Sequence, residues 1–415
     1  MDIFKIFKDY RQFEIFILGM LSGMPLAIIF STLAVWLADY NIPLEVITTF
    51  AIARLSYSAK FLWAPIVDYF TFPFLGRYGH RKSWMIFCAS CMTLLLFLIS
   101  RIDPSESLIF VYFIVISLGF FSATFDVSFD AFRIERFSGD LQGVSAANTV
   151  FGYRIGMLIT GAWALYYAHI TGSWPKTFMA LSLIFASFVV FLFTIKEDTL
   201  VRDKIGNLKF VELKKMIVNP YKDFLIREGA FLILAAVILF KLGDAMLGVV
   251  SMPFYRELGY DKEQIALVIK GVGFAATIVG TYAGGFIIYR IGSYKGLIIT
   301  GVIQSLTHIA FIWLNHQAVS NKALTIAITI ENLGSGMGAA ALVAYLSNLC
   351  NKKYSASQYA LLSSLTSFFN NTVTVYGGSL VRSMGWDSYF YFTMILAIPG
   401  ILLFVYLNKR YPTDK

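Results

Sequence analysis

The hydrophobic residues of this chain gather in long runs that short polar segments separate. The runs hold 18 to 27 residues, and an α-helix needs about 20 to cross the hydrocarbon core of a bilayer. The pattern therefore predicts an all-α membrane protein with twelve transmembrane helices. The runs cover residues 13–38, 45–68, 83–100, 107–127, 142–168, 174–195, 228–251, 262–288, 293–314, 323–349, 357–381 and 386–408.

The longest polar stretch lies between the sixth and seventh runs and is rich in Lys and Arg. It predicts a basic linker over 196–227 between two six-helix bundles, at 1–195 and 228–415. The bundles share features at a fixed spacing, since Gln142 opens the fifth run and Gln358, 216 positions later, opens the eleventh. An internal duplication of this kind is typical of transporters, and it predicts two pseudo-symmetric bundles.

The basic residues are distributed unevenly between the two sides of the predicted membrane. Of the 34 Lys and Arg, 23 lie on the side of the termini and the linker, and six lie on the other side. Basic loops stay in the cytoplasm. We therefore expect both termini and the linker to be cytoplasmic.

Composition narrows the class of protein further. Hydrophobic residues make up 58% of the chain and charged residues 14%, too few charges to cover a water-soluble surface. With three cysteines, two of them inside a run, a disulfide framework is also excluded. The sequence has no nucleotide-binding, hydrolase or zinc motif. We expect no enzyme activity and no cofactor, so uphill transport would have to draw on an ion gradient.

Ionisable residues inside the runs are the main functional signal, because each costs at least a few kcal/mol in lipid. The bases exceed the acids by one, which predicts an anionic ligand. We expect Arg54, Lys60, Arg154, Lys241, Asp244 and Lys270 to bind it, with a structural Lys241–Asp244 pair as the alternative. The bases are Arg54, Lys60, Arg154, Lys241 and Lys270, and the acids are Asp126, Asp130, Asp244 and Glu331.

Asp126 and Asp130 are four residues apart and so share one face of a helix. Two close carboxylates resist double ionisation in a low dielectric, which makes one of them a candidate proton carrier. We predict that both couple proton movement to transport, and that Asp126 pairs with Arg154. Pairing within the helix, to Arg133, is the structural alternative for Asp130.

A charged segment recurs after the second and the eighth runs. Asp68 precedes Arg77, Arg81 and Lys82 in the first copy, and the second copy contains Arg290-Ile-Gly292. Both copies resemble the G-x-x-x-D-R-x-G-R-K signature of the major facilitator superfamily. The resemblance implies that superfamily's fold and a gate that opens and closes through these charges. We assign Glu331, which precedes a glycine-rich stretch, to gating as well.

Further motifs run the length of the chain and resemble the AmpG-type muropeptide permeases, a bacterial branch of that superfamily. They include Ser22-Gly-Met-Pro-Leu26, Lys60-Phe-Leu-Trp-Ala-Pro65, Gly152-Tyr-Arg-Ile-Gly-Met157, Lys241-Leu-Gly-Asp-Ala245 and Ser355-Ala-Ser-Gln358. The resemblance implies proton-driven import of anhydromuropeptides across the bacterial inner membrane for peptidoglycan recycling. The expected partners are an anionic small molecule, protons and the bilayer, with no nucleic acid, in a monomeric protein.

The chain departs from the pattern of that family at Ala34, Phe125, Asn370 and Val375. Asn370 stands 216 positions after Arg154, where the family usually has an Arg, and we expect it to contact the substrate. Two alternatives stay open. One is a permease for another anionic metabolite, such as a coenzyme-A-linked compound, and the other is a membrane receptor that does not transport.

Overall fold

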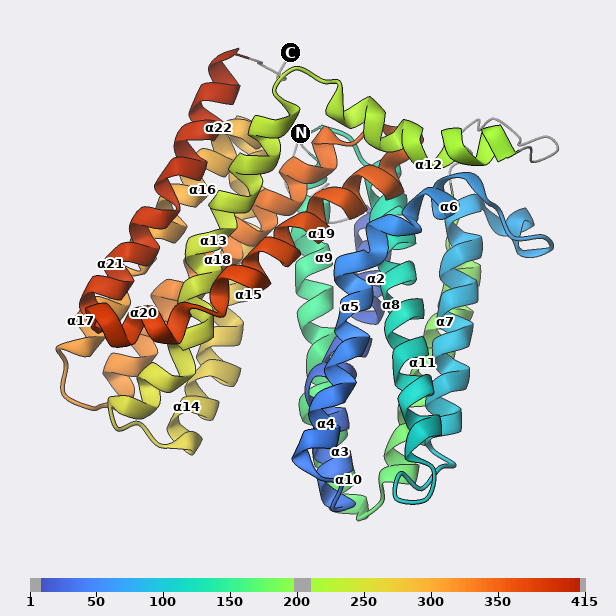
Figure 1. Ribbon diagram of the computed structural model, residues 1–415, viewed down its shortest axis with the longest axis horizontal. Coiled ribbons are helices and arrows are strands. Elements are labelled where there is room, and N and C mark those ends of the chain that lie inside the picture. The colour runs from blue at the N-terminus through green and yellow to red at the C-terminus, as the bar shows by residue number, and fades with distance from the viewer. Residues whose placement is uncertain (1–8, 140, 198–209, 411–415) are drawn as a thin grey trace. The chain divides into compact units, whose positions relative to one another are not determined.

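The computed structural model describes residues 9–139, 141–197 and 210–410, and every regular element in these ranges is a helix (Figure 1). The chain forms two compact units. Unit 1 comprises Met1–Phe137, Asn148–Lys222 and Cys350–Ser364, and unit 2 comprises Ser138–Ala147, Asp223–Leu349 and Leu365–Lys415. The predicted bundles at 1–195 and 228–415 stay a prediction, because part of the linker at 196–227 lies outside the described residues.

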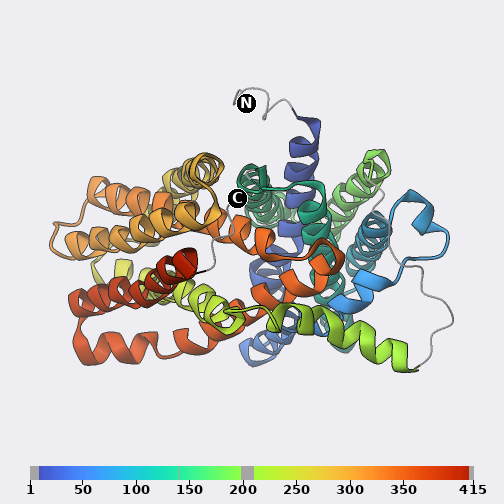
Figure 2. The ribbon, with the colours of Figure 1, turned by 90° about the horizontal axis from the view of Figure 1, so that it is seen from above.

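Unit 1 is built on long apolar helices. In it α7 packs against both α8 and α11, and Figure 2 looks along these helices. Its elements are α2 (Tyr10–Ala27), η1 (Ile28–Thr32), α3 (Leu33–Asp39), α4 (Leu44–Thr49), η2 (Phe50–Arg54), α5 (Leu55–Ala59), η3 (Lys60–Leu62), α6 (Ala64–Tyr69), η4 (Leu75–Tyr78), α7 (His80–Ile99), α8 (Leu108–Arg136), α9 (Leu141–Leu158, which begins in unit 2), η5 (Ile159–Trp163), α10 (Ala164–Thr171), α11 (Trp174–Thr194), α12 (Phe210–Leu225, which ends in unit 2) and η7 (Lys352–Tyr354).

The backbones of α2 and α9 touch along a seam of four glycines: Gly19, Gly23, Gly152 and Gly156. A Cβ atom on Gly23 would overlap the carbonyl oxygen of Tyr153, and one on Gly156 would overlap that of Met20. Small residues allow helices in lipid to approach this closely. Beyond the glycines, the Thr160 hydroxyl donates to the carbonyl of Met24 at 2.6 Å. We call this contact the glycine seam.

Unit 2 has an aromatic core. Phe254 contacts Phe311 and Phe390, and Tyr389 donates its hydroxyl to the Met246 carbonyl at 2.8 Å. Its elements are α13 (Ala230–Glu257), α14 (Lys262–Val268), η6 (Ile269–Gly273), α15 (Phe274–Ile291), α16 (Ser293–Thr307), α17 (Ile309–Asn315), α18 (Asn321–Leu349), α19 (Ser355–Thr374, which begins in unit 1), α20 (Gly377–Met384), α21 (Trp386–Leu396) and α22 (Ile398–Arg410).

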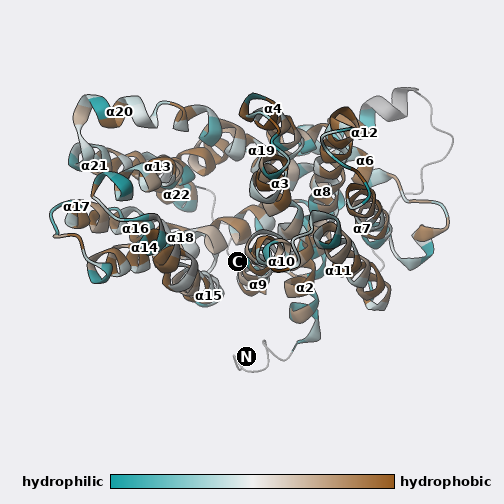
Figure 3. Cartoon of the chain, turned by 90° about the horizontal axis from the view of Figure 1, so that it is seen from below, coloured by the Kyte–Doolittle hydropathy of each residue, from teal (hydrophilic) through white to brown (hydrophobic). Residues whose placement is uncertain are grey.

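Nine helices of the described chain are long and apolar enough to cross a membrane. They match nine of the twelve predicted runs, and hydrophobic residues predominate along the helices (Figure 3). The other three runs are more polar or broken. The second run is divided into α4, η2, α5, η3 and α6, the fifth holds Asn148 and Arg154, and the eleventh holds Asn370 and Asn371. The count of twelve stays a prediction.

The two charged turns recognised in the sequence also share a backbone conformation. Gly79 precedes α7 with φ 128° and ψ 156°, and Gly292 precedes α16 with φ 83° and ψ 164°. A positive φ is strained for other residues, which explains the glycine at both places. Both turns therefore place a glycine of positive φ immediately before a helix.

Candidate functional site

Asp126 lies inside α8 and is 8% exposed. Its Oδ1 accepts a hydrogen bond of 2.6 Å from the Ser22 hydroxyl of α2. Lys60, which is also 8% exposed, lies within Coulombic range of both Asp126 and Asp130. A carboxylate and a neutral donor are therefore in contact in the interior of unit 1, and a buried cation lies near them.

Asp130 lies one turn further along α8 and has a different partner. Its Oδ1 is 3.4 Å from Nη2 of Arg133, and the Arg133 guanidinium is fully buried against the ring of Tyr359, 5.6 Å from its centroid. The intrahelical pair that was the structural alternative for Asp130 is therefore formed. Asp126 and Asp130 share a helix face but belong to separate polar contacts.

Arg154 lies in α9 and is exposed. It makes no hydrogen bond or ion pair with any other described residue, and Asp126 is bonded to Ser22 instead. The predicted Asp126–Arg154 pair is therefore not formed in this structure. Lys60 is the cation near Asp126 because η3 carries its side chain into the interior.

Asp68, Arg81 and Glu135 form a buried ion cluster. The Arg81 guanidinium is fully buried, with its Nη2 2.5 Å from Oδ1 of Asp68 and 2.7 Å from Oε1 of Glu135. Arg81 Nη1 also donates to the Val67 carbonyl at 2.8 Å. Pairing and hydrogen bonding of this kind are what allow charges to stay buried. The predicted Asp68–Arg81 contact is formed.

The same cluster holds the beginning of α19. Asp68 accepts hydrogen bonds from the backbone N–H groups of Ala356 and Ser357, at 3.2 and 2.9 Å, and from the Ser357 hydroxyl at 2.5 Å. The Ser355 hydroxyl donates to Glu135 at 2.6 Å. A carboxylate at a helix N-terminus satisfies N–H groups that have no partner within the helix. We call Asp68, Arg81, Glu135, Ser355 and Ser357 the Asp68 cluster.

Arg77 and Lys82 do not join the Asp68 cluster. Arg77 is exposed, and its guanidinium donates to the Tyr78 hydroxyl at 3.0 Å. The Lys82 ammonium donates to the carbonyls of Phe193 and Ile195 at the end of α11, at 3.1 and 2.6 Å. Of the three basic residues assigned to this gate, Arg81 alone contacts Asp68.

Glu197, which the sequence did not suggest as important, caps α7. Its carboxylate accepts the backbone N–H groups of Arg81 and Lys82 at 3.0 and 2.8 Å. Burial raises the pKa of Glu197, and the two N–H donors oppose that rise. The sequence shows a carboxylate just beyond the sixth run. It does not show that the carboxylate bonds to Lys82, because that residue lies 115 positions earlier.

Unit 2 has a polar centre of its own. The Lys241 ammonium lies 2.5 Å from Oδ2 of Asp244, and the Ser335 hydroxyl approaches the same oxygen at 3.5 Å. His308 is 1% exposed; its Nδ1 lies 3.0 Å from the Thr393 hydroxyl, and its Nε2 has no hydrogen-bond partner in the described structure. The Lys241–Asp244 pair predicted as an alternative to ligand binding is formed.

The remaining predicted residues are dispersed. Arg54 lies over the ring of Phe30, 4.1 Å from its centroid, and Arg290 lies over Phe286 at 5.2 Å. Glu331 accepts a hydrogen bond from the Asn332 amide at 2.7 Å. Oδ1 of Asn370 is buried without a hydrogen-bond partner in the described chain. The side chain of Lys270 lies outside the described residues.

Comparison with known proteins identifies the class of this arrangement. The model of the Major Facilitator Superfamily matches residues 15–369. A protein of Rickettsia felis that carries the name transporter AmpG 4 is 59% identical over 411 residues, which are 99% of each chain. The anhydromuropeptide permease of Escherichia coli K12 is 33% identical over 403 residues, which are 96% of this chain and 80% of that protein.

Two solved structures have the same fold. The proton:xylose symporter XylE, bound to 6-bromo-6-deoxy-D-glucose, matches with a TM-score of 0.67 at 13% identity, over 97% of this chain and 96% of its own. A bacterial homologue of the iron transporter ferroportin matches with a TM-score of 0.66 at 17% identity, over 96% and 99%. The chain therefore belongs to the major facilitator superfamily and, within it, to the AmpG-type permeases. The predicted fold class and family are confirmed.

Proposed function

We propose that this protein imports anhydromuropeptides from the periplasm into the cytoplasm, driven by the proton gradient, for recycling of peptidoglycan. The relatives support the substrate class, because the Escherichia coli permease carries anhydromuropeptide in its name and aligns along almost the whole chain. The excess of basic residues on one side supports an inner-membrane protein with cytoplasmic termini.

Asp126 is the proposed proton carrier, and its burial beside Lys60 is the observation on which the coupling rests. The ionised carboxylate would neutralise the Lys60 ammonium. Once protonated, Asp126 would keep a hydrogen bond with Ser22 but would no longer neutralise Lys60. The Lys60 ammonium could then attract a carboxylate of the ligand. Proton and ligand binding would then favour one another reciprocally.

Further residues are proposed to contact the substrate. Arg154 is exposed and has no partner among the described residues, so it is available to an anion. The buried amide oxygen of Asn370 lacks a donor, which a hydroxyl or amide of the ligand would supply. Arg54, Lys241, Asp244 and Lys270 are the further candidates.

The Asp68 cluster is the proposed gate. Its bonds to the first turn of α19 use five polar side chains and two backbone N–H groups. These bonds would form in one access state and separate in the other, as bistable polar contacts do in transporters. The same movement would involve the other residues assigned to gating, which are Arg77, Lys82, Arg290 and Glu331.

The test uses purified protein in proteoliposomes and a labelled N-acetylglucosaminyl-anhydro-N-acetylmuramyl tripeptide. We expect accumulation only under an imposed proton gradient, and competition by unlabelled tripeptide but not by acetyl-coenzyme A. Arg154→Ala should abolish both accumulation and counterflow, because it removes a binding residue. Competition by the coenzyme-A compound alone would show that the substrate is another anion.

A further inference from the structure

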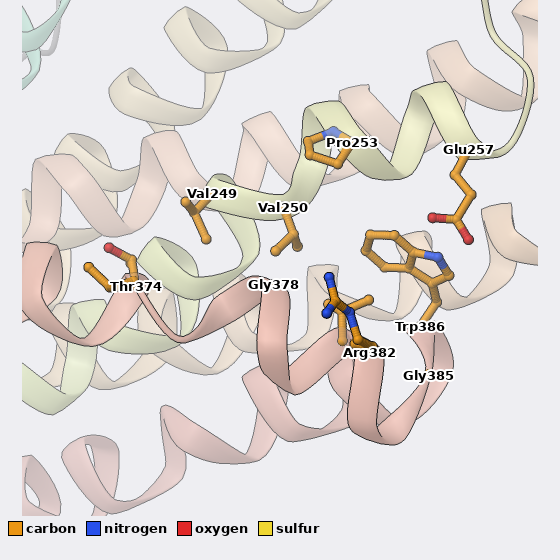
Figure 4. A pocket seen from close by; sticks show the side chains of 11 residues that line it. Val249, Val250, Pro253, Glu257, Thr374, Gly378, Arg382, Gly385 and Trp386 are labelled. Atoms are coloured by element: carbon orange, nitrogen blue, oxygen red, sulfur yellow. The ribbon is translucent and has the colours of Figure 1, made fainter. Parts of the chain in front are cut away.

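A cavity of about 680 Å³ opens in unit 2 at the end of α13 that carries Glu257 (Figure 4). Its walls come from α13 on one side, and from the end of α19, α20 and the turn into α21 on the other. A volume of this size is typical of sites for small molecules. The cavity is separate from the Asp126 and Lys241 contacts, since neither of those residues lines it.

Two oppositely charged side chains in this cavity have no partner. Arg382, on α20, and Glu257, at the end of α13, are both exposed, and neither makes a hydrogen bond or ion pair with another residue of the described chain. In Figure 4 the Arg382 guanidinium points into the cavity, and Trp386 lies between it and Glu257. A ligand that carries both an anionic group and hydrogen-bond donors could satisfy both ends.

The Trp386 indole is held rigidly between those charges. It stacks on Phe390 with ring centroids 5.7 Å apart and an interplanar angle of 23°, and it contacts Phe254 at 4.8 Å. Phe254 and Phe390 belong to the buried core of unit 2. The indole therefore presents a fixed apolar face, and such a face pairs well with the C–H face of a sugar ring.

The cavity lies where the end of α19 and α20 face α13. On α13 the cavity wall carries Val249, Val250 and Pro253, whereas the α2–α9 contact of unit 1 has glycines. Gly377, the first residue of α20, packs closely on Val249 and Val250, and the cavity opens beyond it, beside Pro253 and Glu257.

We propose that this cavity binds the part of the substrate that is a sugar ring bearing a carboxylate. The carboxylate lies against Arg382, the ring lies on Trp386, and hydroxyl or ammonium groups donate to Glu257. The choice of an anhydromuropeptide as this ligand rests on the proposed function. In the proposed orientation the cavity lies on the periplasmic side, where it captures the substrate before transport.

The experiment measures protection of an introduced thiol in the full-length protein. Val375 lines the cavity and is 78% exposed, so Val375→Cys should react rapidly with a maleimide. The labelled tripeptide named above should slow that alkylation, and Arg382→Gln should remove the protection. The control is Lys322→Gln, which removes a positive charge from an exposed residue of unit 2 that does not line the cavity.

Transport provides the second readout. Arg382→Gln should raise the KM for uptake about tenfold at unchanged maximal rate, the effect of one lost charge-assisted hydrogen bond. Protection without uptake would support the cavity and contradict the proposed transport. Uptake with an unchanged KM and no protection would overturn the cavity alone. Protection by phosphatidylglycerol vesicles but not by tripeptide would identify a lipid headgroup as the ligand of the cavity, and this result would also overturn the proposal.

Discussion

Asp68 accepts the backbone N–H of Ser357 at 2.9 Å, although 289 residues separate the two in the chain. The Ser357 hydroxyl donates to the same carboxylate oxygen at 2.5 Å. The first turn of α19 is therefore held by a carboxylate that also balances the buried Arg81. Any movement of α19 that breaks this contact takes three hydrogen-bond donors from Asp68 and one from Glu135, while Arg81 keeps both of its carboxylates.

Asp68→Asn should weaken the hold on α19 without unfolding the protein, because the amide oxygen still accepts one donor. Cys350, 9% exposed and just before η7, reports the change. In a protein with Cys88 and Cys91 replaced, we expect its alkylation to accelerate about tenfold, which corresponds to about 1.4 kcal/mol. Glu106→Gln, which removes an exposed loop carboxylate, is the control. An unchanged rate would mean that the Asp68 cluster is static.

Asp126→Asn should separate downhill exchange from accumulation. The amide imitates the protonated carboxylate, so substrate still binds and counterflow persists, but no proton is carried. Accumulation driven by the gradient should fall to the background level. Both assays are run in the same proteoliposomes. If Asp126→Asn still accumulates substrate, the carrier is another acid, and Asp130, Asp244 and Glu331 become the candidates.

Lys60 and Asp126 should be energetically coupled. Lys60→Gln alone should reduce substrate affinity, because it removes the cation that the protonated carboxylate releases. In the double variant the two losses should not add, and we expect an interaction energy of about 0.5–3 kcal/mol in substrate binding. Binding of labelled tripeptide to all four proteins of the cycle measures it. Strict additivity would exclude a direct role for Lys60 in coupling.

Gly23→Ala should destabilise the protein, because the new Cβ would overlap the carbonyl oxygen of Tyr153 across the glycine seam. Overpacking of this kind costs about 1–3 kcal/mol. Gly248→Ala is the matched control, since that helical glycine has open space around its Cβ position. Thermal unfolding in detergent compares the two. Equal transition temperatures would contradict the close contact of α2 and α9.

The fold could be predicted largely because lipid imposes a length on each apolar run. Nine runs became long apolar helices in the described chain, and most of their ends lie within three residues of the predicted ones. Two helices extend further, since the fourth run was predicted to end at 127 and the seventh at 251, whereas the helices end at Arg136 and Glu257. The break of the second run into short pieces was not foreseen. Pro65 in the sequence indicated a break in the helix. The 3-10 turn at Lys60–Leu62 depends on packing, which hydropathy does not encode.

The polar contacts were predictable when both partners lay close in sequence. Lys241 and Asp244 are three residues apart, and their pairing follows from helix geometry. Asp68 and Arg81 share one motif. The bonds from Ser22 to Asp126 and from Ser357 to Asp68 join distant helices, and no periodicity within one run indicates them.

The glycine seam also constrains how this protein can evolve. Where two backbones touch, no side chain larger than that of glycine fits. We therefore expect few tolerated substitutions at the four seam positions, Gly19, Gly23, Gly152 and Gly156. Gly248, with open space beside it, should drift freely. In a library of all single substitutions, the four seam positions should appear as two depleted pairs spaced four residues apart. New substrate ranges would then have to arise from residues elsewhere in the helices.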